Sequence, residues 1–143
     1  MRWMVRISVP EGPKNKMTRI DIRFSDQDSQ GHVSGLKICE WIAHARVEFI
    51  DAMIKKSGVD NLDYTLAHLE VDFLEEARFP GTIDVLSRVG AIGGKSLTTK
   101  YSVTRDAHPI AKAKCVNVFF NIRTDQTTKI PQALRLVLDG EGI

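Results

Sequence analysis

Two aspartates and a histidine lie close together in the polar residues 25–35, directly before a long apolar segment. Asp26 and Asp28 carry carboxylates, which can act as a general base or as a nucleophile, and His32 can assist proton transfer. The structural alternative is a turn or helix cap, because aspartate is common in both. The spacing alone makes the two aspartates equal candidates for a catalytic role.

Backbone donors are expected beside these carboxylates. Ser34 and Gly35 come immediately before the apolar segment, at the expected start of a helix. The first N–H groups of a helix have no partner within the helix, so they can bind developing negative charge. For the Ser34 side chain we favour the ordinary role of an N-cap.

The apolar segment is predicted to be one long helix over residues 36–56, ended by Gly58. At about 100° per residue its polar side chains fall on one narrow line. A helix with so thin a polar stripe is mostly buried, against something larger than a neighbouring helix. The stripe consists of Lys37, Glu40, His44, Glu48, Asp51 and Lys55.

Arg46 lies opposite that polar line, within the apolar face of the predicted helix. A buried arginine needs a carboxylate or several carbonyl groups. An ion pair, within the chain or across to a second copy, is the favoured interpretation. Ligand binding is the alternative.

The rest of the chain alternates between apolar and polar residues, as strands do. The alternation predicts strands near residues 18–24, 66–79, 82–92, 96–106 and 110–123, a polar link at 59–64 and a helical turn at 129–136. A strand, one buried helix and an antiparallel meander predict an α+β domain whose sheet curls around the helix. Residues 17–143 are predicted to form this domain, and residues 1–16 an N-terminal arm or extra strand.

Composition restricts the class of protein. The 143 residues include 43% hydrophobic and 27% charged residues with a net charge of +2, which is ordinary for one globular domain. The scattered basic residues give no reason to expect nucleic acid, and no apolar run is long enough to cross a membrane. Without the apolar core of a signal peptide, we expect a cytoplasmic protein. Cys39 and Cys115 are expected to be free buried thiols.

The order of elements resembles the hotdog-fold acyl-CoA thioesterases of the 4-hydroxybenzoyl-CoA thioesterase type over residues 17–138. The stretches that carry the resemblance read RFSDQD and GHV in the loop, ARVEF in the helix, and then VDF, ARFPG, IGGKS and KIP. The loop is also similar to that of the acyl-carrier-protein thioesterases, which place a histidine where His32 stands.

The resemblance implies a thioesterase that hydrolyses acyl-CoA or acyl-carrier-protein thioesters without a metal. No cofactor is implied, since coenzyme A is part of the substrate. The enzyme would be a homodimer or tetramer with active sites at subunit interfaces, and would need neither nucleic acid nor membrane. A non-catalytic acyl-thioester-binding or assembly subunit is the alternative, because a fold does not determine a function. A hotdog hydratase is disfavoured because its histidine motif is absent.

The resemblance also assigns roles. Asp28 matches the catalytic carboxylate, and Gly35 matches the residue whose backbone N–H polarises the thioester carbonyl. Relatives carry asparagine or larger residues at positions 34 and 35, so a side chain that lines the site is missing here. His32 is a supporting candidate. Lys95 and Ser96 match a region that contacts coenzyme A phosphates, with a solvent-exposed turn as the alternative.

Overall fold

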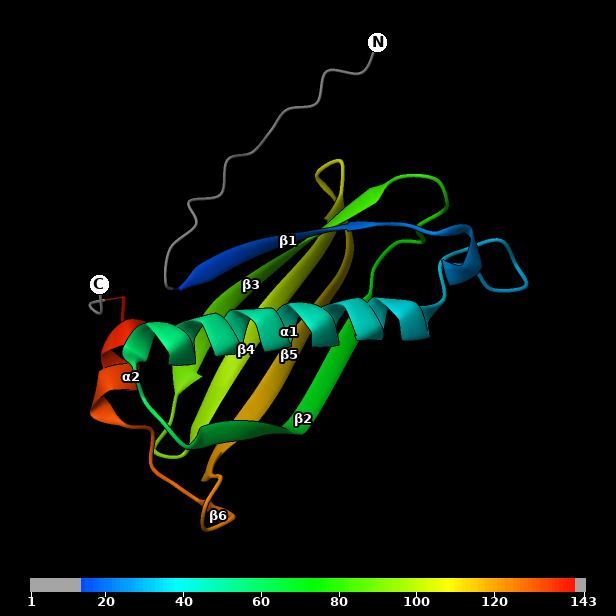
Figure 1. Ribbon diagram of the computed structural model, residues 1–143. Helices are drawn as coiled ribbons and strands as arrows, with labels where there is room; N and C mark the ends of the chain where they lie inside the picture. Colours follow the sequence, from blue (N-terminus) through cyan, green and yellow to red (C-terminus); the bar gives the residue numbers. More distant parts are fainter. Residues whose placement is uncertain (1–13, 141–143) are drawn as a thin grey trace.

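The computed structural model describes residues 14–140, in which one long helix, α1 (Gly35–Ser57), lies across one face of an antiparallel sheet (Figure 1). The strand order is β1-β3-β4-β5-β2, with β6 paired to the end of β5. The α+β hotdog fold, an antiparallel sheet around one central helix, is therefore confirmed. The strands are β1 (Asn15–Asp21), β2 (Leu62–Phe73), β3 (Thr82–Ile92), β4 (Ser96–Arg105), β5 (His108–Asn121) and β6 (Gln126–Thr127).

Both ends of α1 are set by local sequence, as predicted. Ser34 is the N-cap, and its Oγ accepts a hydrogen bond of 3.2 Å from the Leu36 N–H. Gly58 follows the last turn with a φ of +73°, a left-handed conformation that glycine adopts without strain. The expected polar stripe lies on the outer side of α1, where its residues are exposed or half-buried.

The opposite face of α1 packs on the sheet and forms two adjoining hydrophobic clusters. Ile38 and Ile42 in the first half of the helix contact the strand residues of one cluster. Phe49 and Ile50 in the second half pack with a short terminal helix, α2 (Gln132–Leu138). The flank of α1 beside the edge of the sheet is less covered, and Leu36 and Val47 are exposed there.

Strand β2 differs from its prediction at both ends. It begins at Leu62, inside the expected polar link, and ends at Phe73, so residues 74–81 are loop. A bulge between Leu66 and His68 shifts its register against β5. Since a one-residue insertion exchanges the faces of a strand, Leu66 and Leu69 both face the helix. Simple alternation along the sequence does not reveal such a shift.

Two smaller boundaries also differ from expectation. β1 begins at Asn15, two residues before the predicted start of the domain, and β6 was not predicted. Residues 1–13 of the predicted N-terminal arm or extra strand lie outside the described residues. The expected short helix after Pro131 is present as α2.

Candidate active site

Asp28 lies in a small closed loop between a 3₁₀ turn (Phe24–Asp26) and α1. Gln27 and Val33 form an antiparallel bridge at its base, and the Asp28 N–H donates to the His32 carbonyl at 2.7 Å. Gly31 closes the turn with a φ of +79°, which favours glycine. The loop thus holds Asp28 in a defined place just before the helix.

Main-chain donors favour the ionised form of the Asp28 carboxylate. Its Oδ1 accepts the N–H of Gln30 at 2.9 Å and that of His32 at 3.2 Å. These hydrogen bonds, that from Gln30 first, lower the pKa of Asp28 below its usual value. Oδ2 has no hydrogen-bond partner among residues 14–140. This exposed carboxylate therefore has one oxygen fixed by the loop and one free to act as a base or nucleophile.

The His32 ring points to a different partner. Its Nε2 lies 3.0 Å from Glu76 Oε2, in the loop after β2. The Val33 N–H donates to the Ala77 carbonyl, and this hydrogen bond holds the Asp28 loop against the loop after β2. Within one chain, His32 lowers the pKa of Asp28 mainly through its backbone N–H, and the charge of its ring makes a smaller contribution in the same direction.

Asp26 has the structural role expected of a turn residue. Its side chain is fully buried, and Oδ2 accepts the Arg23 N–H at 2.7 Å. Oδ1 lies 3.5 Å from Arg23 Nη2 and 3.9 Å from Lys37 Nζ. The Asp26 carbonyl accepts the Ser34 N–H, which links the turn to the start of α1.

Gly35 is the first residue of α1, and its N–H has no acceptor among residues 14–140. A β-carbon at this position would lie 3.3 Å from Cζ of Phe73, so the ring of Phe73 approaches the helix start closely. Phe73 thus lies beside the position for which the resemblance implies a larger side chain in related thioesterases. A free backbone donor and an aromatic wall occur together here.

The β3–β4 turn lies near α2, at the opposite end of the sheet from the Asp28 loop (Figure 1). Lys95 belongs to this turn, and Ser96 is the first residue of β4. Lys95 Nζ donates to Thr127 Oγ1 at 3.4 Å, and the Gly93 N–H donates to the Ser96 carbonyl. One chain does not bring them near Asp28. A contact between these residues and a substrate held at Asp28 would require a second chain.

Arg46 is buried, as predicted, and lies between α1 and the sheet. Its Nε donates to Asn117 Oδ1 at 2.5 Å, and its guanidinium lies 5.1 Å from the ring centroid of Tyr64. The expected carboxylate is missing within the described chain, because no acidic side chain of residues 14–140 forms an ion pair with Arg46. The helix pattern predicts its burial but not these partners.

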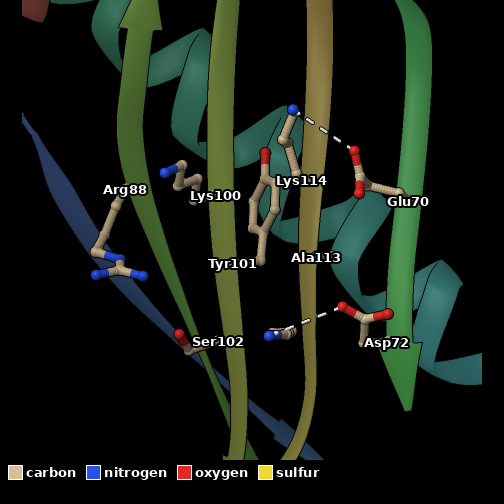
Figure 2. A pocket seen from close by; sticks show the side chains of 9 residues that line it. Glu70, Asp72, Arg88, Lys100, Tyr101, Ser102, Ala113 and Lys114 are labelled. Atoms are coloured by element: carbon tan, nitrogen blue, oxygen red, sulfur yellow. Dashed lines mark ion pairs between the residues drawn. The ribbon is translucent and has the colours of Figure 1, made fainter.

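The outer face of the sheet carries a separate group of charges around a shallow depression of about 340 Å³ (Figure 2). Arg88, Lys100, Lys114 and Glu70 are successive cross-strand neighbours there. This face lies on the other side of the sheet from α1, so it contains no part of the Asp28 site.

Three contacts at these sites were not predicted, namely those made by Phe73, Glu76 and Asn117. Phe73 belongs to the VDF motif, but only the folded chain places its ring against Gly35. Within residues 14–140, no group of three or more metal-binding side chains was found, and no helix is both long and apolar enough to cross a bilayer. Cys39 and Cys115 are both free, the first half-buried and the second buried.

Solved structures of thioesterases have the same fold. A protein from Bacillus stearothermophilus described as a predicted thioesterase superposes with a TM-score of 0.79 and 24% identity, covering 90% of this chain and 96% of that one. A gentisyl-coenzyme A thioesterase gives 0.74 and 16%, covering 86% and 99%. The DHNA-CoA thioesterase of Staphylococcus aureus gives 0.68 and 15%, covering 80% of each chain.

No individual curated protein matches the chain. A protein family does match the sequence, over most of its length. The family match covers residues 22–138, from the loop that holds Asp28 to the end of α2. It confirms the resemblance drawn from the loop and helix motifs. The chain belongs to the Thioesterase-like superfamily.

Proposed function

We propose that this protein is an acyl thioesterase that hydrolyses acyl-CoA or acyl-carrier-protein thioesters to a free acid and a thiol. The observation that carries the proposal is the Asp28 carboxylate, held ionised by two main-chain N–H groups with its second oxygen free. It lies in the loop that leads directly to the Gly35 N–H at the start of α1. Membership of the Thioesterase-like superfamily supports the same reaction.

The proposed reaction uses these two groups. Asp28 takes a proton from water, and the resulting hydroxide adds to the thioester carbonyl carbon. The Gly35 N–H, at the positive end of the helix dipole, stabilises the oxyanion that forms. The C–S bond then breaks, and the departing thiolate takes the proton from Asp28. In the alternative route, Asp28 attacks the carbonyl itself, the C–S bond breaks and the thiolate leaves. Water then hydrolyses the mixed anhydride to the acid and the Asp28 carboxylate, and the proton released from water converts the thiolate to the thiol.

The second candidate is a non-catalytic acyl-thioester-binding or assembly subunit. One observation favours it: Asp28 is exposed in the single chain, where water surrounds its charge. In a homodimer or tetramer, a second chain would cover the loop and exclude that water, as sites at subunit interfaces require. The cytoplasmic location and the requirement for no cofactor stay predictions.

A thiol-release assay tests the proposal. The full chain is incubated with short, long and aromatic acyl-CoAs and with acyl-carrier-protein thioesters, and the free thiol is measured with a chromogenic reagent. We expect turnover of at least one substrate class and its loss in Asp28→Asn. Saturable binding without turnover would favour the binding subunit, and turnover unchanged in Asp28→Asn would exclude the proposed mechanism. In a single turnover in ¹⁸O-water, label in Asp28 identifies direct attack followed by addition of water to the aspartyl carbonyl carbon, because the general-base route places the label only in the product acid.

A further inference from the structure

The same face of α1 that begins with Gly35 also carries Arg46. At 3.6 residues per turn, Gly35, Cys39 and Arg46 fall within a narrow sector of the helix, with Arg46 about 16 Å beyond Gly35. Two residues of β2 lie beside the first and the last of these helix positions. Phe73 lies against Gly35, and the ring of Tyr64 lies 5.1 Å from the Arg46 guanidinium.

The strip between these two ends is apolar and only partly covered. The β2 bulge turns Leu66 and Leu69 toward the helix side, where they are 41% and 39% exposed, and Phe73 is 55% exposed. Leu69 pairs with Cys115, whose buried thiol adds another apolar wall. An acyl chain that starts at the Gly35 N–H can therefore extend along the strip toward Arg46.

Arg46 carries a positive charge that the described chain does not neutralise. Its side chain is nine-tenths buried, and Nε has the single partner Asn117 Oδ1. The remaining guanidinium N–H groups have no hydrogen-bond partner among residues 14–140. The two Nη atoms are not among the fully buried atoms that lack a partner, so an acceptor can reach them, and a negatively charged group there would compensate the partly desolvated cation.

The neighbours of Arg46 are fixed and cannot supply that group. Asn117 Nδ2 donates to the Leu97 carbonyl at 2.9 Å and to Thr99 Oγ1 at 3.1 Å, which orients its oxygen toward Arg46. The carboxylate of Asp51 accepts the Tyr64 hydroxyl at 2.6 Å. Arg46 is thus held in place by neutral groups, with its free N–H donors preorganised for an incoming acceptor.

We infer that Arg46 binds a carboxylate at the far end of the acyl group, so that thioesters of dicarboxylic acids are the preferred substrates. The inference rests on the proposed thioesterase function. The planar guanidinium offers paired donors to a carboxylate, and long helical side chains lean toward the helix N-terminus, which shortens the span from Gly35. The thioester end lies at Gly35 and the charged end at Arg46.

Pairs of substrates that differ in the charge of the distal group test whether Arg46 binds a carboxylate. Adipyl-, suberyl- and sebacyl-CoA are each compared with the matching monomethyl ester of the same chain length. At the best length, kcat/KM should favour the free carboxylate by on the order of tenfold to a hundredfold, as for hydrogen bonds to a charged group. The difference should lie mainly in KM, because the carboxylate is distant from the reacting carbonyl.

Variants of Arg46 test whether this residue causes the preference for the carboxylate over the ester. Arg46→Met should remove it and make the ester the better substrate, whereas Arg46→Lys should keep part of it. Arg135→Met is the matched control, because Arg135 donates to the Gly93 carbonyl at the other end of the sheet and should not alter the preference. Melting temperature and sedimentation are recorded for each variant.

The outcomes separate the inference from the function on which it rests. Equal hydrolysis of carboxylate and ester by the unaltered enzyme would overturn the inference and leave the thioesterase proposal in place. Loss of both activities in Arg46→Met together with dissociation of the dimer would show an intersubunit ion pair instead. If Arg46→Met does not fold, the unaltered enzyme and Arg46→Lys still decide. No hydrolysis of any thioester would overturn both proposals.

Discussion

Asp28 and His32 hold each other through the main chain: the Asp28 N–H donates to the His32 carbonyl at 2.7 Å, and the His32 N–H donates to Asp28 Oδ1 at 3.2 Å. The second bond requires only a side-chain oxygen, which asparagine also has. Asp28→Asn should therefore keep the loop and the melting temperature. Because the amide is neither a base nor a nucleophile, kcat should fall by about 10²–10⁴ with little change in KM.

Asp26→Asn is the matched control for that variant. The amide oxygen can still accept the Arg23 N–H, but the buried charge beside Arg23 and Lys37 is lost. We expect a lower melting temperature and near-normal kcat at a temperature where the variant is folded. If Asp26→Asn lost kcat and Asp28→Asn retained it, the assignment of the two carboxylates would be reversed.

The pH dependence of the rate follows from the two hydrogen bonds to Asp28. Only the ionised carboxylate can act, so kcat/KM should fall as the pH falls through the Asp28 pKa. Because Gln30 and His32 lower that pKa, the midpoint should lie below the ordinary aspartate value of about 3.9. A pH series from neutral to acid, limited to conditions where circular dichroism shows folded protein, measures it. A midpoint well above the ordinary value would show that a second chain or the substrate desolvates Asp28.

The same shift has a consequence for stability. A carboxylate whose pKa is lower in the folded state stabilises the protein at pH values above its unfolded pKa. That contribution is lost as the pH falls through the folded value. His32→Ala should keep most of this behaviour, because the donor is the backbone N–H. If His32→Ala instead moved the acid midpoint of kcat/KM to a much higher pH, the imidazole rather than the backbone N–H would be responsible for the lowered pKa of Asp28.

We expect a stable dimer in solution. β2 is an edge strand, and exposed apolar side chains lie on it and on the adjacent flank of α1: Leu36, Val47, Leu66, Leu69 and Phe73. A second copy that pairs along this edge would cover the open strand and would enclose the apolar strip between α1 and β2 along which the acyl chain is proposed to lie. Leu69→Lys should therefore weaken association and reduce activity together, measured by sedimentation and thiol release. Leu136→Lys, at an exposed position of α2, is the control. A stable monomer of the unaltered protein at micromolar concentration would contradict the prediction.

On the outer face of the sheet, we predict a substitution that makes the protein more stable. Lys100 lies directly between Arg88 and Lys114, and no ion pair of Lys100 exists within residues 14–140. Like charges opposite each other on neighbouring strands destabilise a sheet, so Lys100→Thr should raise the free energy of unfolding by about 0.2–1 kcal/mol at low salt. The gain should shrink at high salt. Lys112→Thr is the control, because Lys112 lies 3.9 Å from Asp72 and should bring no such gain.

Local patterns were sufficient where a structure depends on neighbours in the sequence. The polar stripe, Ser34 and Gly58 predict α1 with its correct ends, since capping and helix periodicity involve residues a few positions apart. The role of Asp26 in a turn also follows from its immediate surroundings. The β2 bulge was not predictable, because its register is set by pairing with β5, which lies far away in the sequence.

By itself, the sequence determined the order of strand, loop, long helix and meander and the family, and the family resemblance then favoured Asp28 over Asp26 as the candidate carboxylate. Only the tertiary structure decided which distant groups meet those elements. It places the Phe73 ring against Gly35, pairs His32 with Glu76, and puts the Asn117 amide beside Arg46 where a carboxylate was expected. The physical reason is that contacts across a sheet and a helix depend on register and close packing of the whole chain, which short-range patterns do not encode.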